Sequence, residues 1–253
     1  MGSTIALRFD ADRAYVTLDR PDKHNGLTFE MLGELVAAAR AIGRRDDVRA
    51  VILAGNGPSF SSGLDIAKAT RDPLAIVRNF VPLPWRGTNT FQEACWAWRR
   101  LRVPVIAAVH GNCFGGGLQI ALAADIRIAH PDSKFSVMET RYGLVPDMSG
   151  AVTLSQLLGV DRALLLTMTA DIVDAEHAAR IGLITEVSDD PVAAAEELAD
   201  RIATRPAQAV AAAKRLFDKS WHSSPRRTLA TERATQLPLI LQMARTRDKK
   251  STD

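Results

Sequence analysis

Three consecutive glycines separate an apolar run from a helix-forming run, and they constrain the fold more than any other stretch. Gly115–Gly117 follow Val105–Val109, which predicts a buried strand, and precede the Ala/Leu-rich segment Ile120–Ala124, which predicts a helix. The glycines leave backbone N–H groups uncovered at the positive end of the helix dipole, where an anion or a developing negative charge is stabilised. The turn therefore predicts a strand–helix unit with an electron-rich ligand at the junction.

Segments that favour strand and helix alternate along the chain as far as Ser149. Ile5–Phe9 and Tyr15–Leu18 alternate apolar and polar residues around a turn, which predicts a β-hairpin. A helix is expected after Thr28, a common N-cap residue, and a short strand over Val48–Ala54. Such alternation predicts the α/β fold class with a largely parallel sheet.

The chain changes character after this point. Nearly every later segment favours helix, and only Leu183–Val187 predicts a strand. We divide the chain into an α/β core, residues 1–190, and a C-terminal helical region, residues 191–253, which together form one functional unit. Within the core, the proline-rich and irregular stretch Arg71–Gly87 is expected to be a surface loop or a lid.

Charge and cysteine content exclude several classes of protein. The chain has 32 basic and 29 acidic residues, a net charge of +3, which gives no basic face for nucleic acid. No apolar run reaches the ~18 residues of a membrane span, and the N-terminus lacks the pattern of a signal peptide. Cys95 and Cys113 make no disulfide framework, so we expect a cytoplasmic protein. The histidines lack metal-ligand spacing, and no metal site is expected.

A second loop, Ser59–Asp65, also lies between a predicted strand and a predicted helix. Its serines suit a helix N-cap, and that alternative stays open. Paired with the glycine turn, the loop would supply the second backbone donor of an oxyanion hole. No G-x-S-x-G elbow is present, and neither loop matches the dinucleotide fingerprint G-x-G-x-x-G. A nucleotide-binding domain is therefore disfavoured.

Two carboxyl groups, Glu139 and Asp147, lie eight residues apart and flank a mostly apolar stretch. Carboxyl groups near apolar surface have raised pKa values and can act as general acid or base. The alternative is a pair of solvated surface carboxylates. The stretch is a candidate for proton-transfer chemistry if the fold brings it to the glycine turn.

Four motifs occur in one order along the chain. They are Arg20–Leu27, similar to R-P-x-x-x-N-A-L; Phe60–Asp65, similar to F-x-A-G-A-D; His110–Gly117, similar to N-G-x-x-x-G-G-G; and Ala123–Arg127, similar to C-D-I-R. In this order, and over most of the chain, the sequence resembles the enoyl-CoA hydratase/isomerase (crotonase) superfamily.

The resemblance implies a crotonase-like spiral of ββα units with a helical C-terminal trimerisation region, and a homotrimer or hexamer. It implies an acyl-CoA thioester as substrate and no separate cofactor, because CoA is part of that substrate. Carried over by position, the backbone N–H groups of Ser62 and Gly116 would form the oxyanion hole for the thioester oxygen. The other residues expected to contact substrate are His24, Gly26, Gly63, Leu64, Asp65, Gly115, Gln119 and Pro146.

The expected catalytic positions depart from the pattern of the family's hydratases, which hold a water between two glutamates. Glu139 corresponds to the second glutamate, but Gln119 stands in place of the first, and an amide does not accept a proton at neutral pH. The spacing of Asp147 from Glu139 instead resembles the acidic pair of the dienoyl-CoA isomerase branch, which normally also has an aspartate at the position of Gln119. We therefore rank a double-bond isomerase first, an enoyl-CoA hydratase of fatty-acid β-oxidation second, and a non-catalytic acyl-CoA binder third.

Overall fold

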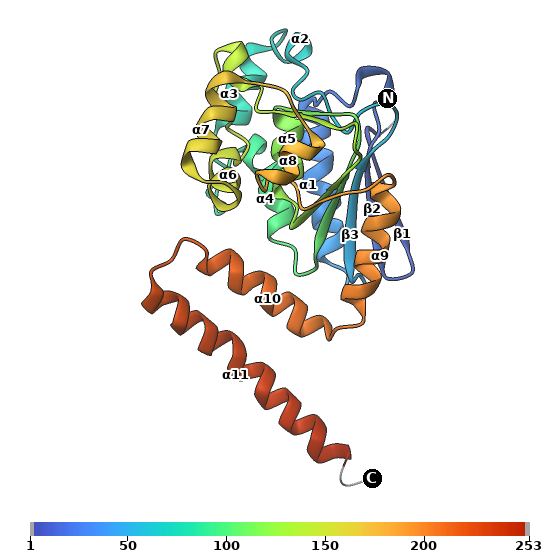
Figure 1. Ribbon diagram of the computed structural model, residues 1–253, viewed down its shortest axis with the longest axis vertical. Coiled ribbons are helices and arrows are strands. Elements are labelled where there is room, and N and C mark those ends of the chain that lie inside the picture. The colour runs from blue at the N-terminus through green and yellow to red at the C-terminus, as the bar shows by residue number, and fades with distance from the viewer. Residues whose placement is uncertain (1–2, 251–253) are drawn as a thin grey trace.

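A six-stranded sheet forms the centre of the protein, seen here in a computed structural model that describes residues 3–250, with side chains for residues 3–244 (Figure 1). The strand order is β1-β2-β3-β4-β6-β9. The β1–β2 pair is antiparallel and every later pair is parallel, as the alternation of segments predicts. The strands are β1 (Ile5–Asp10), β2 (Arg13–Leu18), β3 (Ala50–Gly55), β4 (Val105–Val109), β6 (Ile126–Ala129) and β9 (Glu186–Val187).

A second, three-stranded sheet consists of β5 (Asn112–Phe114), β7 (Lys134–Ser136) and β8 (Val173–Asp174). The chain passes from a strand of the large sheet to a strand of the small sheet and then into a helix, as in β4–β5–α5, where α5 is Gly116–Ala123. An isolated bridge between Ser61 and Cys113 brings the loop after β3 against the small sheet in the same way. This repeat is the ββα pattern that the family resemblance implies.

Helices cover both faces of the large sheet (Figure 1). On one face lie α1 (Phe29–Gly43), α4 (Thr90–Arg99) and α5 (Gly116–Ala123), packed around fully buried side chains such as Leu35, Leu53 and Trp98. The predicted N-cap of α1 is confirmed, because the Thr28 side chain accepts a hydrogen bond from the Met31 N–H. On the other face, α9 (Pro191–Ala203) packs Ala195 and Ala199 against the strands.

The stretch predicted to be an irregular loop contains a helix, α3 (Pro73–Phe80), which follows the single turn α2 (Ile66–Ala69). The Asp72 side chain accepts a hydrogen bond from the Ala75 N–H, and Pro73 occupies the first turn, where it needs no N–H partner. The irregular-loop prediction is therefore wrong over residues 73–80. Proline content misled the prediction because proline interrupts the interior of a helix but is also common in a helix's first turn.

The last core strand is shorter than the sequence predicts. Leu183 and Ile184 are buried, but their N–H groups donate to the carbonyl of Ala178, in helix α8 (Ala175–Arg180), instead of pairing with a strand. Leu183 and Ile184 are therefore apolar because they are buried in a turn, and the strand of this segment that pairs with β6 is Glu186–Val187.

The remaining helices of the core are η1 (Pro21–Lys23), η2 (Glu139–Tyr142), α6 (Gly150–Leu157), α7 (Val160–Thr169) and α8 (Ala175–Arg180).

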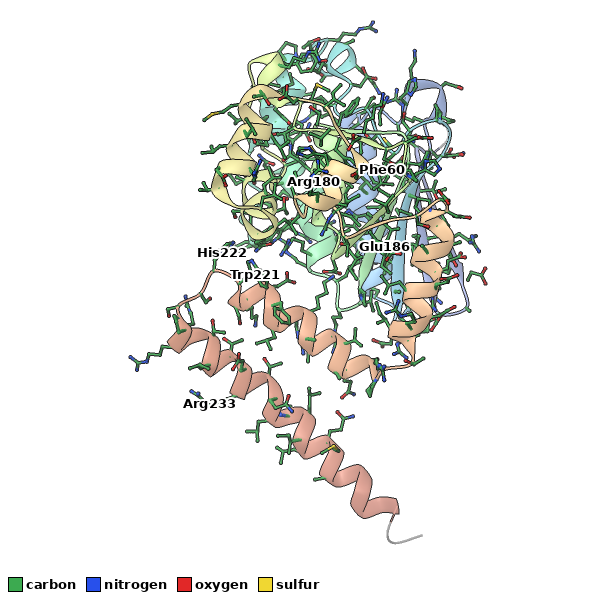
Figure 2. The ribbon with its side chains drawn as sticks, viewed as in Figure 1. Phe60, Arg180, Glu186, Trp221, His222 and Arg233 are labelled. Carbon is green, nitrogen blue, oxygen red and sulfur yellow. The ribbon has the colours of Figure 1, made fainter. Side chains whose placement is uncertain are left out.

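The chain ends in an arm of two helices, α10 (Ala207–Ser220) and α11 (Pro225–Lys250), which pack on each other and extend away from the core (Figure 1). Side chains such as Phe60 fill the interior of the core, whereas Trp221, His222 and Arg233 lie on the arm (Figure 2). None of the helices built from residues 3–250 has both the length and the apolar character needed to cross a bilayer.

Candidate active site

The two predicted loops and the Glu139–Asp147 stretch meet around one cavity of about 340 Å³. The cavity is lined largely by apolar side chains from α1, α3 and α4, including Phe29, Ile76 and Phe91. Predicted site residues that line it are Ser62, Gly63, Leu64, Gly115, Gly116, Glu139 and Asp147. The fold therefore brings together three segments that lie far apart in the sequence, and both candidate carboxyl groups are among them.

The two loops are hydrogen-bonded to each other. The Ser61 N–H donates to the Asn112 carbonyl at 2.9 Å, and the Phe114 N–H donates to the Ser61 carbonyl at 3.0 Å. Gly63 lies at φ +89°, where a side-chain Cβ would come within 2.9 Å of the Phe114 carbonyl oxygen. Glycine is required there both by the backbone angle and by the closeness of the second loop.

The structure corrects one half of the predicted oxyanion hole. The Ser62 N–H already donates to the His24 carbonyl at 2.8 Å, so it is not available to a substrate oxygen. The N–H groups of three neighbours are used as well, those of Ser61, Gly63 and Asp65. Within the described part of the chain, the Leu64 N–H has no acceptor, and Leu64 lines the cavity. The available donor is therefore two residues further along than the motif match suggests.

The second predicted donor, Gly116, is the first residue of α5, and no acceptor for its N–H is found among the described residues. A free N–H is expected at the start of a helix, which has no preceding turn to accept its first hydrogen bonds. The position that a Cβ on Gly63 would take lies 3.6 Å from the Gly116 nitrogen, so the two loops meet at this donor. Leu64 and Gly116 thus supply open backbone donors to one cavity.

Glu139 begins η2 and is 9% exposed. Its Oε1 atom accepts a hydrogen bond of 2.6 Å from the Gln119 side-chain amide. Its Oε2 atom is buried without a hydrogen-bond partner among the described residues. Burial raises the pKa of Glu139, hydrogen bonds from its own backbone and from Gln119 oppose the rise, and the nearby charge of Asp147 adds to it.

Asp147 is half-buried on the loop that leads to α6, and it lines the same cavity as Glu139. Burial raises its pKa, against a lowering hydrogen bond from its own backbone. Two carboxyl groups with raised pKa values in one apolar cavity can share the roles of proton donor and acceptor.

Five predicted substrate contacts, His24, Gly26, Asp65, Gln119 and Pro146, are absent from the lining of the cavity. Asp65 caps α2 by accepting the Lys68 N–H at 3.1 Å and pairs with Arg20 at 3.3 Å. The His24 ring lies 3.0 Å from the Ser59 hydroxyl. These two contacts connect the motif Arg20–Leu27 to the loop Ser59–Asp65. Contact between either residue and a substrate stays a prediction.

Gln119 lies behind Glu139, buried to 2% exposure. Its Oε1 atom accepts hydrogen bonds from the Met148 and Gly150 N–H groups, both at 2.8 Å. No pattern in the sequence predicts these contacts, because they depend on how the loop after Asp147 folds back onto α5.

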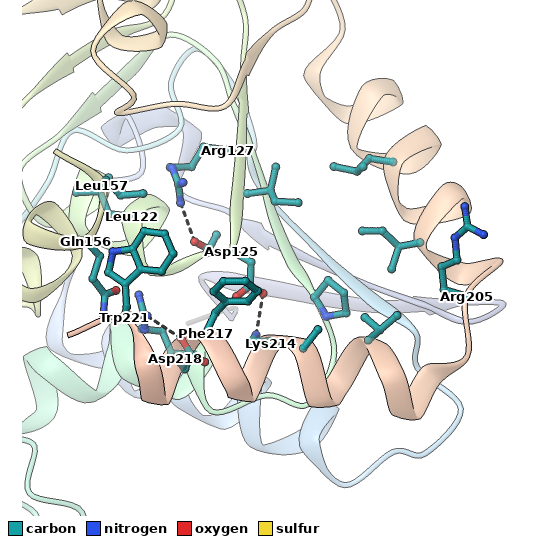
Figure 3. A pocket seen from close by; sticks show the side chains of 18 of the residues that line it. Leu122, Asp125, Arg127, Gln156, Leu157, Arg205, Lys214, Phe217, Asp218 and Trp221 are labelled. Atoms are coloured by element: carbon teal, nitrogen blue, oxygen red, sulfur yellow. Dashed lines mark hydrogen bonds and ion pairs between the residues drawn. The ribbon is translucent and has the colours of Figure 1, made fainter. Parts of the chain in front are cut away.

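A larger cavity of about 630 Å³ lies between α10 and the core (Figure 3). Its acidic groups are already paired with cations: Asp125 with Lys214 at 2.8 Å, and Asp218 with Arg99 at 2.7 Å. These ion pairs fasten the arm to the core. Because its carboxylates are neutralised in this way, we take the smaller cavity as the candidate active site.

The arrangement of two backbone donors and two carboxyl groups agrees with the match of the whole chain to known proteins. The sequence model described as "Enoyl-CoA hydratase/isomerase" matches residues 9–251. The chain belongs to the enoyl-CoA hydratase/isomerase family. Its members are acyl-CoA enzymes.

Relatives within the enoyl-CoA hydratase/isomerase family resemble this chain in sequence and in structure. "Probable enoyl-CoA hydratase EchA17" of Mycobacterium tuberculosis is 35% identical over 232 residues, which cover 88% of this chain and 84% of that protein. The enoyl-CoA hydratase of Thermoplasma volcanium is 28% identical and superposes with a TM-score of 0.85, covering 95% and 93% of the two chains. A "putative enoyl-CoA hydratase" of Thermobifida fusca, solved with acetoacetyl-CoA, is 31% identical with a TM-score of 0.84 and covers 95% and 96%.

Proposed function

We propose that this protein is an acyl-CoA isomerase that moves a double bond within an enoyl- or dienoyl-CoA thioester. The observation that carries the proposal is the presence of two carboxyl groups with raised pKa values, Glu139 and Asp147, in one apolar cavity with an amide at position 119. One carboxylate removes a proton from a carbon α or γ to the thioester carbonyl, and the resulting carbanion is conjugated with that carbonyl. The other carboxylic acid returns a proton to a different carbon of the same chain.

Proton removal moves negative charge onto the thioester oxygen and produces an enolate. The free N–H groups of Leu64 and Gly116 are the donors that would stabilise this oxygen. Fixed backbone donors are effective because they need no reorganisation as the charge develops, and removal of one such donor costs roughly 3 kcal/mol in other enzymes. The proton count balances, since one proton leaves the substrate and one returns.

An acyl-CoA thioester is supported as the substrate class by two observations. The Thermobifida fusca relative was solved with acetoacetyl-CoA, and a second structure of that protein contains CoA. The apolar side chains of the cavity in this chain suit an acyl group. No separate cofactor is part of the proposal, because CoA enters with the substrate.

Assembly and location are further parts of the proposal. The arm exposes apolar side chains, among them Leu237, Ile240 and Leu241, which supports self-association into a trimer or hexamer. Cys95 and Cys113 are both buried free thiols, and the prediction of a reducing, cytoplasmic setting rests on them.

Hydration of an enoyl-CoA is the second candidate, favoured by the names of the relatives. In that reaction Glu139 would be the main acid/base group, with Gln119 helping to place the water. The hydrogen bonds of Gln119 count against this role, because its carbonyl oxygen and one N–H are already directed at protein atoms.

A panel of thioesters separates the two reactions. We would incubate the full chain with 2-enoyl-, 3-enoyl- and 3,5-dienoyl-CoA substrates, follow the absorbance of the conjugated thioester, and weigh the products. Isomerisation leaves the mass unchanged, whereas hydration adds one water. A water adduct from the 2-enoyl-CoA without isomerised product would favour the second candidate, and binding without turnover would leave only an acyl-CoA binder.

A further inference from the structure

The side-chain amide of Gln119 has only one orientation that fits its surroundings. Two backbone N–H groups, those of Met148 and Gly150, point at one end of the amide from 2.8 Å each. Only the carbonyl oxygen can accept these bonds, because an amide nitrogen is a donor. The nitrogen must therefore face Glu139, 2.6 Å from its Oε1 atom.

This orientation decides where the proton of Glu139 sits. Because the Gln119 nitrogen can only donate, the Oε1 atom of Glu139 must accept and cannot carry the proton toward the amide. The proton is left to Oε2, which is buried and has no partner within the described residues. If Glu139 exchanges a proton with a substrate, Oε2 is the oxygen left to do so.

The same amide also holds the segment that carries Asp147. Met148 follows Asp147 directly, and its N–H is one of the two donors to Gln119. At Gly150, a side-chain Cβ would come within 2.6 Å of the Gln119 oxygen, so the loop approaches the amide as closely as its backbone allows. One side chain thus ties Glu139 to the loop of Asp147.

We infer that Gln119 is a positioning residue, which fixes the proton of Glu139 on Oε2 and holds the Asp147 loop in register with it. A glutamate at this position could still accept the Met148 and Gly150 hydrogen bonds. Its second oxygen would face Glu139 Oε1, where two carboxyl groups either repel or share a proton. With an amide at position 119, the acid–base partner left for Glu139 is Asp147. This inference rests on the proposed function for its meaning in catalysis, but the effect of Gln119 on the titration of Glu139 and on the Asp147 loop can be measured without substrate.

The test compares Gln119→Met, which removes both donor and acceptor, with Gln119→Glu, which removes only the donor. The matched control is Gln156→Met, on the lining of the larger cavity. In each full-length protein, ¹³C-labelled glutamate carboxyl groups are titrated by NMR, with the Glu139 signal assigned by its loss in Glu139→Gln. Exchange of the Met148 and Gly150 amides is measured alongside.

We expect Glu139 to titrate at higher pH in both position-119 variants, because the donor that stabilises its ionised form is gone. The Met148 and Gly150 amides should exchange faster in Gln119→Met and stay protected in Gln119→Glu, and Gln156→Met should match the wild type. Isomerase activity should fall about ten- to hundredfold in Gln119→Met, the range for losing a hydrogen bond to an ionised group.

An unchanged titration of Glu139 in folded Gln119→Met overturns the inference. If that variant does not fold, an unchanged titration in Gln119→Glu overturns it equally. A shifted titration in a protein without isomerase activity would uphold the positioning role and reject the proposed reaction. Isomerase activity with an unshifted Glu139 titration would support the proposed reaction and reject the positioning role of Gln119.

Discussion

The Gln119 side-chain amide donates a 2.6 Å hydrogen bond to Glu139, which lines the same cavity as Leu64 and Gly116, two residues whose N–H groups have no acceptor among the described residues. Gln119 is buried and absent from the lining of that cavity, so Glu139 and Asp147 are the carboxyl groups left to meet a substrate. This relationship separates the site from one that holds a water between two carboxylates.

Removal of either carboxyl group should abolish most of the isomerase activity. General acid–base catalysis contributes roughly 10²- to 10⁴-fold to a rate, so Glu139→Gln and Asp147→Asn should each lose turnover within that range. Binding of a non-reactive acyl-CoA, measured by calorimetry, should stay close to that of the wild type. Full activity in both variants would remove these residues from the mechanism.

The stability of Glu139→Gln should depend on pH in a defined direction. Burial raises the pKa of Glu139 in the folded protein, so over the window above its ordinary pKa the folded state holds a proton that the unfolded state has lost. Stability of the wild type therefore falls as pH rises through this window. Glutamine has no such penalty, and the variant should gain stability relative to the wild type on going from about pH 4 to about pH 7. Urea midpoints at the two pH values measure this, and a difference that does not change with pH would contradict it.

The assignment of the oxyanion donor to Leu64 can be tested one N–H at a time. Replacing the amide of residue 64 by an ester removes its N–H and should lower kcat by roughly 10²- to 10³-fold. The same replacement at Ser62 removes only the hydrogen bond to the His24 carbonyl. It should cost about 1 kcal/mol of unfolding free energy and leave kcat intact. A loss of kcat for the ester at Ser62, with kcat unchanged for the ester at residue 64, would instead make Ser62 the donor.

Alanine substitution at two glycines with positive φ angles separates backbone strain from contact between the two loops. Gly63, at φ +89°, would place a Cβ 2.9 Å from the Phe114 carbonyl oxygen, whereas Gly87, at φ +69°, has nothing within 4 Å. Both alanine variants carry the strain of a positive φ, about 1–2 kcal/mol. Gly63→Ala must also push the two loops apart, so it should be the less stable variant in urea and should lose activity as the Leu64 donor moves. Equal stability and activity of the two would contradict the packing described.

Local rules predicted much of the fold. The cap at Thr28, the strand Val105–Val109 and the helix after the glycine turn depend on neighbours in sequence, and all three are present. The helix over Pro73–Phe80 was missed because proline ends and begins helices alike.

The site itself was only partly predictable, for a physical reason. Motifs indicate which segments meet, and Glu139, Asp147 and Gly116 do share a cavity. Which N–H is free depends on long-range hydrogen bonds such as that from Ser62 to His24, and motif position does not report them. The contacts of Gln119 have the same origin.

The choice between isomerisation and hydration is tested most directly by turnover in H₂¹⁸O with 2-enoyl-CoA and 3,5-dienoyl-CoA supplied together. The absorbance of the conjugated thioester reports isomerisation, and mass spectrometry of the acyl-CoA species reports addition of water. We expect the dienoyl-CoA to be converted to an isomer of unchanged mass, and neither acyl chain to acquire ¹⁸O. Rapid appearance of an ¹⁸O-labelled hydroxyacyl-CoA with the dienoyl-CoA left unconverted would contradict it.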